Sequence, residues 1–216
     1  MYKYPHPPRP RHREEWHEEY AYVLDFLPQG NPFDRHPQHR RNPIAQVIGE
    51  KYFTLLEVGP KPRVYLELGE RVYIGHGLRD KISHIYGRIT YDDLTTVARD
   101  NLYQVIYKIV TEKEFVFVDF FNIAEPITLK FHALELLPGI GKKSLKIILE
   151  ERKKKPFESF SDFQERTRIN DPAKLIVDRI ILELQGGEKY YLFVKPTHDR
   201  GVYLGYLIKL YRLKGL

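Results

Sequence analysis

Hydrophobic and polar positions give the first half of the chain the pattern of a β-sheet. Short apolar runs, rich in β-branched and aromatic residues, alternate with turns made of Gly, Pro and charged residues. Five such runs follow one another closely, which is the count and spacing of a small closed barrel. We expect this barrel over residues 15–91, with strands at 18–27, 43–49, 52–59, 71–75 and 85–91.

After the last expected strand, the period changes to that of a helix. Apolar residues recur three and four positions apart over 94–110, and Thr90 with Asp93 supplies a start that resembles a capping box. Residues 113–123 are apolar on all sides, which favours a buried helix. The pattern therefore predicts connecting helices over 92–124 and an α+β fold.

A further helix is expected over 126–137, with its proline at the first helical position, and it leads into "LLPGIGKKS". Glycine adopts positive φ at no steric cost, so Gly139 and Gly141 allow one helix to end and the next to begin at once. Ile140 between them is expected to anchor the turn in the core. The next helix is expected to begin near Lys142.

The start of that helix has the properties of an anion site. The first N–H groups of a helix lack partners within the helix and lie at the positive end of its dipole. Lys142, Lys143 and Lys146 add positive charge beside them. A phosphodiester is the anion that repeats along a polymer, so this arrangement predicts a sequence-independent contact with the backbone of nucleic acid.

The segment "LELLPGIGKKSLKIIL" resembles the helix-hairpin-helix motif, with Leu145 where a small residue is usual. The segment "RTRINDPAKLIVDRIILEL" resembles a second, degenerate copy, in which Asn170 stands at the position of a glycine, Asp171 caps the helix and Lys174 lies in its first turn. Two copies form the usual tandem unit, which we expect over 125–187. Asn170 and Lys174 therefore join the expected contacts with nucleic acid.

A longer stretch, from about residue 18 to 195, resembles an archaeal family of unknown function. The segments "RVYIG", "VDFFNIAEPITLKFHALELLPGIGKK" and "PFESF" carry this resemblance. The family is described as a predicted nucleic-acid-binding, RNA-binding protein with an oligonucleotide-binding (OB) barrel and helix-hairpin-helix repeats. The resemblance therefore implies a five-stranded OB-like barrel and RNA as the ligand, and it implies no reaction.

Composition agrees with a ligand that is anionic. The chain of 216 residues carries 35 Lys and Arg against 29 Asp and Glu, a net charge of +6. It contains no cysteine, which excludes disulfides, thiol catalysis and thiolate metal sites and fits a reducing compartment, so we expect a cytoplasmic protein. Residues 1–14 are expected to be a flexible basic arm. No apolar run has the length of a membrane span, and no cofactor is expected.

The expected barrel offers a second contact surface. Aromatic side chains on such barrels stack on nucleobases beside a basic track, and the alternative for each of them is burial in the core. The candidates for stacking are Tyr52, Phe53, Tyr65, Tyr73 and Tyr86. Arg35, Arg40 and Arg41, in the long loop after the first strand, are expected to contact the ligand directly.

Two other classes of function stay open. Lys143 with Asp162 downstream resembles the lysine and carboxylate of glycosylase/lyase enzymes that act on DNA, although the same lysine occurs in hairpins that only bind. The expected C-terminal strand and basic aromatic tail, 188–216, could dock a partner protein or a membrane surface, or could fold back on the barrel. The histidines lack partners at ligand spacing, so no metal site and no catalysis are expected.

Overall fold

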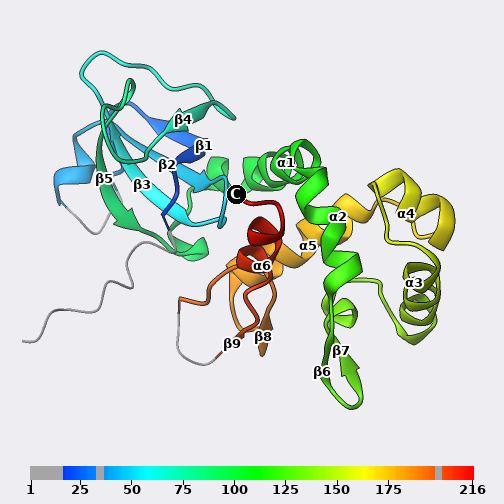
Figure 1. Cartoon of the computed structure of the whole chain (residues 1–216). Helices are drawn as coiled ribbons and strands as arrows, with labels where there is room; N and C mark the ends of the chain where they lie inside the picture. Colours follow the sequence, from blue (N-terminus) through cyan, green and yellow to red (C-terminus); the bar gives the residue numbers. More distant parts are fainter. Residues whose placement is uncertain (1–16, 33–36, 198–200) are drawn as a thin grey trace, which may run out of the picture.

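The computed structural model describes residues 17–32, 37–197 and 201–216. Within them, a five-stranded antiparallel sheet lies on one side of the molecule and the helices lie on the other (Figure 1). The mixed α+β class is therefore confirmed, whereas the expected arm, 1–14, lies outside the described residues. The strands are β1 (Tyr20–Leu27), β2 (Ile44–Gly49), β3 (Leu55–Pro60), β4 (Arg71–Tyr73) and β5 (Ile82–Arg88).

The sheet is curled but open, so the expectation of a closed barrel is wrong. Its strand order is β4-β1-β2-β3-β5, and the two edge strands do not pair with each other in the described part of the chain. Closure requires the edge strands to complete the hydrogen-bond ladder, and β4 has only three residues. The result is a half-barrel. One side of the sheet contributes to a small core of Ala21, Val23, Ala45, Val47, Leu56, Val58, Leu66, Val72, Ile74 and Ile82.

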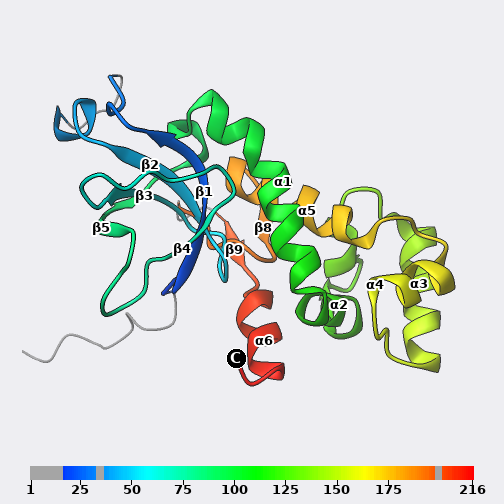
Figure 2. The same ribbon diagram turned by 90° about the horizontal axis from the view of Figure 1, so that it is seen from above.

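Two helices join this sheet to the rest of the molecule. The helix α1 (Thr96–Glu112) packs on β1 and on α5 (Pro172–Gln185) (Figure 2). Thr90 and Asp93 do form a capping box, but it closes a single 3-10 turn, and α1 itself is capped by the Thr95 hydroxyl, which accepts from the Ala98 amide. The helix α2 (Glu114–Ile123) is buried, as its apolar sequence predicts.

Three further helices follow in this part of the molecule. The helices α3 (Lys142–Lys154) and α4 (Phe160–Thr167) pack against each other, α3 also contacts α2, and α4 contacts α5. Two arginines fix the ends of these helices. Arg152 donates to the carbonyls of Phe121, Asn122 and Ala124 at the end of α2, and Arg166 donates to those of Glu151, Lys155 and Pro156 near the end of α3. These two charged side chains therefore stabilise the helix ends.

The helix expected over 126–137 is wrong. This segment forms a β-hairpin of β6 (Pro126–Thr128) and β7 (Phe131–His132), followed by the 3-10 helix η3 (Ala133–Leu136). Proline lacks an amide hydrogen, and the β-branched residues after it favour extended backbone. His132 then caps η3, because its Nδ1 accepts from the Leu134 amide while Glu135 accepts from the His132 amide.

A buried ion pair fastens the segment after α5 to that helix. Arg179 and Glu183 lie one helical turn apart, with 2.8 Å between Nε and Oε1, and both side chains are almost fully buried. Glu183 also accepts from the backbone amides of residues 192–194, and Arg179 donates to the carbonyl of Tyr190. The short strands β8 (Tyr190–Tyr191) and β9 (Val202–Tyr203) pair with each other beside this ion pair.

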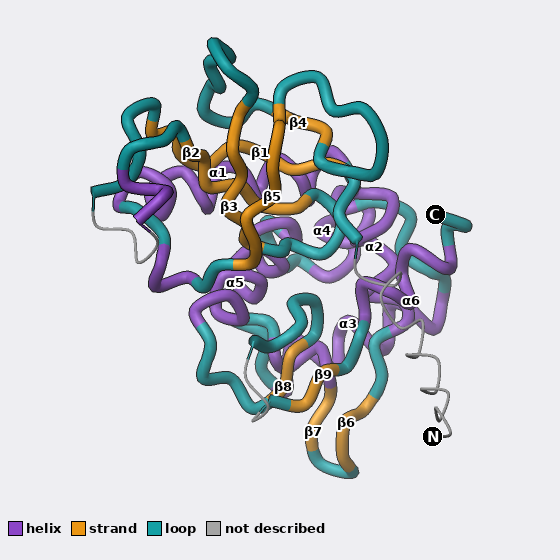
Figure 3. The backbone as a smooth tube through the Cα atoms, turned by 90° about the vertical axis from the view of Figure 1, so that its left-hand side faces the viewer, coloured by secondary structure: helices purple, strands orange, loops and turns teal. Residues whose placement is uncertain are grey.

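The C-terminal tail folds back on the protein. The helix α6 (Tyr206–Leu213) packs against α2 (Figure 3). It buries an apolar face made of Tyr206, Leu207, Leu210 and Tyr211. This apolar face is therefore already covered by the chain itself. Among the described residues, no helix has the length and apolarity needed to cross a membrane.

We expect Leu210→Ala to destabilise the protein and Leu213→Ala to have little effect. Leu210 is fully buried, whereas Leu213 on the same helix is 59% exposed. Truncating a buried leucine costs about 2 kcal/mol or more, because contacts are lost and a cavity remains. Thermal and urea unfolding of the two variants measures the difference. Equal stability of both would show that α6 does not pack on the body in solution.

Candidate nucleic-acid interface

The first candidate contact is the turn between η3 and α3. Gly139 has φ +88°, which favours glycine, although a Cβ there would meet, within the described parts of the chain, only the Leu175 side chain, at 4.0 Å. Ile140 is 5% exposed and donates its amide hydrogen to the Leu137 carbonyl, so it anchors the turn as expected. Leu175 lies in the first turn of α5, so this turn adjoins the start of that helix.

Gly141 plays a different role from the one the sequence suggests. Its backbone is extended, with φ −98° and ψ −175°, so positive φ does not explain this glycine. It is the N-cap of α3, it is exposed, and a Cβ at this position would meet no atom of the described residues within 4 Å. A glycine in open space keeps the surface free of side-chain atoms, which allows another molecule to approach the backbone closely.

The start of α3 is open to an external acceptor. The first amide to find an acceptor is that of Leu145, which donates to the Gly141 carbonyl at 2.9 Å. The amides of Lys142, Lys143 and Ser144 have no acceptor in the described chain, and the first turn contains no acidic residue. In contrast, α1, α4 and α5 are each capped by a side-chain oxygen, from Thr95, Ser159 and Asp171.

The three lysines at this turn are not equivalent. The ammonium of Lys142 contacts Glu135 Oε1 at 2.7 Å and donates to the Lys130 carbonyl at 2.8 Å, so it holds the β6–β7 hairpin against α3. Although burial alone would raise the pKa of Glu135, Lys142 and the His132 amide lower it, so this carboxylate stays charged. Lys143 has no acidic partner in the described chain, and Lys146 lies 3.8 Å from Glu150 on the exposed surface.

The second candidate turn, between α4 and α5, is less open. Its left-handed residues are Arg168 and Asp171, so Asn170, which is exposed, does not replace glycine conformationally. Asp171 caps α5 and places its own carboxylate where a phosphate would bind. Lys174 is exposed but pairs with Asp178 at 2.9 Å. Arg168 is an exposed cation in this turn that sequence reasoning missed, although it stands only two residues before Asn170.

The aromatic and basic residues predicted to contact nucleic acid on the sheet differ in their exposure. Phe53 is fully buried and cannot stack on a base, and the Tyr73 hydroxyl donates to the His76 carbonyl. Tyr65 and Tyr86 are 70% and 40% exposed. Arg35 lies outside the described residues, whereas Arg40 and Arg41 are exposed at the end of the 3-10 helix η1 (Pro37–Arg40).

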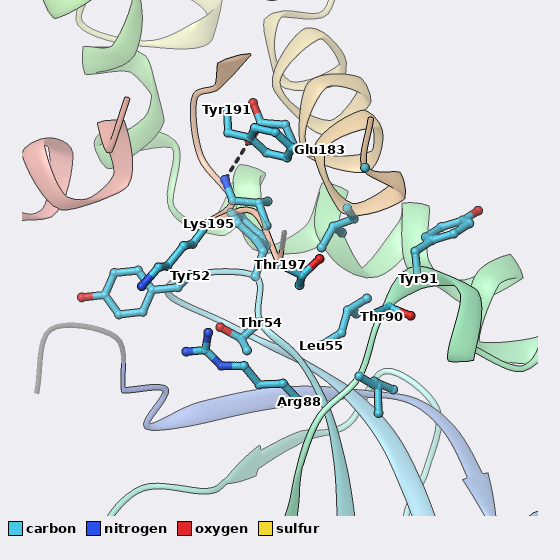
Figure 4. A pocket seen from close by; sticks show the side chains of 15 residues that line it. Tyr52, Thr54, Leu55, Arg88, Thr90, Tyr91, Glu183, Tyr191, Lys195 and Thr197 are labelled. Atoms are coloured by element: carbon cyan, nitrogen blue, oxygen red, sulfur yellow. Dashed lines mark hydrogen bonds between the residues drawn. The ribbon is translucent and has the colours of Figure 1, made fainter. Parts of the chain in front are cut away.

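A small pocket of about 70 Å³ lies between the sheet and the segment that follows α5. Arg88 at the end of β5 and Lys195 extend beside the ring of Tyr52 (Figure 4). Neither cation was expected from the sequence, because their proximity depends on how the chain after α5 returns to the sheet. Aromatic and basic groups therefore meet here, as they do in sites for single strands.

The alternatives find little support in the geometry. Burial alone would raise the pKa of Asp162, but the Glu158 amide and Arg166 lower it, so this carboxylate is occupied at the start of α4. His39 contacts Glu57 at 3.1 Å, and His132 caps η3. In the described ranges no three His, Asp or Glu side chains gather as metal ligands would.

Comparison with known proteins places this architecture among archaeal proteins. The model of the DUF655 family, described as a protein of unknown function, matches residues 17–195. The chain is 50% identical over 180 residues to the uncharacterized protein MJ0038 of Methanocaldococcus jannaschii, which covers 82% of this chain and 80% of that protein. It is 51% identical to Af1531 from Archaeoglobus fulgidus, whose crystal structure matches with a TM-score of 0.76 over 82% of this chain and all of that one.

Proposed function

Because the chain belongs to the DUF655 family of proteins of unknown function, we propose its role from its own geometry: it binds nucleic acid through the sugar-phosphate backbone, without catalysis. The observation that carries this proposal is the open start of α3, where an exposed glycine meets Lys143 and three amides, none of which has a partner among the described residues. A phosphate would accept from those amides at the positive end of the helix dipole.

The proposal also assigns a role to each of the two parts of the molecule. The half-barrel acts as an OB-like platform, and the turns before α3 and α5 act as tandem helix-hairpin-helix motifs, the first with a shortened leading helix. Tyr52, Arg88 and Lys195 extend the contact surface onto the sheet side, where a single strand could stack on Tyr52. The choice of RNA over DNA as the natural ligand rests on the resemblance of the sequence to the archaeal family. Competition between RNA and DNA 12-mers of the same sequence tests that choice.

The proposal predicts binding that depends strongly on salt. If about five phosphates of a single-stranded 12-mer are neutralised, the logarithm of the binding constant falls with the logarithm of salt with a slope near −3.5. Fluorescence anisotropy across a salt series measures this slope. An affinity that does not change with salt would exclude contacts with the phosphate groups.

Two lysines on α3 provide a matched pair for this measurement. Lys143 lies in the first turn beside the open amides, whereas Lys153 lies in the last turn, and both are exposed. We expect Lys143→Gln to reduce the magnitude of the slope by about 0.7, one contact, and Lys153→Gln to leave it unchanged.

A further inference from the structure

A second cavity, of about 510 Å³, lies where the sheet meets α6. No residue of the turn before α3 lines it. Figures 1 and 2 show α6 between the sheet and α2. The walls come from the start of β1, the turn between β2 and β3, β4, the junction of α1 with α2 at Lys113, and α6. Five separate segments therefore build this cavity.

Two ammonium groups converge on one aromatic ring in its wall. Lys51 Nζ lies 5.0 Å and Lys113 Nζ 5.5 Å from the centre of the Tyr211 ring. Lys51 also lies 5.7 Å from the ring of Tyr52. The faces of the rings attract both cations, and the like charges of the two ammonium groups repel each other.

The carboxylate of Glu50 in the cavity wall already has two cationic partners. Glu50 Oε1 contacts Lys113 at 2.7 Å, and Glu50 Oε2 accepts from Arg71 at 2.5 Å. Lys51 has no acidic partner in the described part of the chain, and Glu19, the second acidic side chain of the cavity wall, is exposed. The wall therefore carries the cations Lys51, Arg71 and Lys113 against Glu19, Glu50 and the terminal carboxylate of Leu216, and none of these acids forms an ion pair with Lys51.

We propose that this cavity binds a nucleoside monophosphate, either free or as the phosphorylated end of a strand. The phosphate lies between Lys51 and Lys113, and the base lies against the half-buried ring of Tyr52. The cavity volume is in the range of about 300 to 1,000 Å³ of small-molecule sites, and its walls combine aromatic rings with a few convergent charges, as such sites do. This site contains none of the residues at the start of α3, but it shares Tyr52 with the sheet-side surface of the proposed function.

Calorimetric titration of the full chain with AMP and UMP tests the site. We expect Lys51→Met, which keeps the aliphatic stem, to weaken binding at least about tenfold, because the phosphate loses a charge-assisted hydrogen bond. Lys209→Met is the matched control: its ammonium lies 4.7 Å from the Tyr206 ring, outside the cavity, so its loss should not change binding. No binding by the unaltered protein at millimolar nucleotide, or equal binding by Lys51→Met, would overturn the proposal.

Two 12-mers of one sequence, with and without a 5′-phosphate, distinguish the sources. Tighter binding of the phosphorylated strand that depends on Lys51 identifies a strand end as the ligand. Dependence on Lys51 for mononucleotides alone identifies a free nucleotide. Gly141→Val, at the start of α3, should leave mononucleotide binding intact, so failure of this site and failure of the proposed backbone contact can be told apart.

Discussion

Gly141→Val is expected to remove most of the affinity for nucleic acid while the protein stays folded. The backbone at Gly141 is extended and its Cβ position is empty, so valine fits the fold. Valine is a poorer N-cap than glycine, which costs no more than about 1 kcal/mol. Its side chain would occupy the space in front of the open amides of α3. Losing one charge-assisted hydrogen bond, about 1.5 to 3 kcal/mol, weakens binding roughly 10- to 150-fold.

The matched variant is Gly139→Val, two residues earlier. Gly139 has φ +88°, a conformation that costs a β-branched residue on the order of 1 to 3 kcal/mol. This variant should therefore lower thermal stability, and any loss of binding should accompany that loss of stability. Anisotropy and thermal unfolding of both variants separate the roles. If Gly141→Val binds like the unaltered protein, the amides of α3 do not contact the ligand.

Arg179→Met is expected to lower the free energy of unfolding by about 3 to 5 kcal/mol, because it leaves the carboxylate of Glu183 buried without its counter-charge. Arg179 also reaches the carbonyls of Leu136, at 3.4 Å, and Tyr190. It thus connects α5 with the end of η3 just before the candidate turn and with the segment after α5. The same loss should therefore loosen the turn that presents the open amides.

Lys174→Met is the control for that experiment. Lys174 and Asp178 form an ion pair of the same spacing on the same helix, but the lysine is exposed. Water and salt screen exposed pairs, so the stability should hardly change. Urea unfolding compares the two variants. A small effect of Arg179→Met would contradict the buried network as a support of the turn.

Local patterns were enough to predict most of the elements. Short apolar runs rich in β-branched and aromatic residues placed the five strands to within a few residues, and apolar residues three and four positions apart placed α1. The buried α2 was inferred from its apolar residues on every side. Sheet closure was not predictable in this way, because it depends on whether the two edge strands pair with each other, and local sequence does not show that β4 pairs only with β1 and β5 only with β3.

The candidate site shows a similar division. The turn and the helix start of α3 follow from two glycines and a lysine pair, but the segment 126–137 was misassigned because Ile127, Phe131 and Leu134 fit a helix period as well as a β-hairpin. The engagement of Lys142 by Glu135 depends on that hairpin. Arg88 and Lys195 meet only through tertiary structure, so no local signal joins them.

The most direct test of the proposed contact between α3 and phosphate measures the chemical shifts of the backbone amides themselves. Nitrogen-proton correlation spectra of the labelled full chain, recorded during titration with a single-stranded RNA 12-mer, report each amide separately. We expect the amides of Lys142, Lys143 and Ser144 to shift most, and to move downfield as they donate to phosphate. Shifts confined to the sheet, with these three amides unmoved at saturating RNA, would contradict the account.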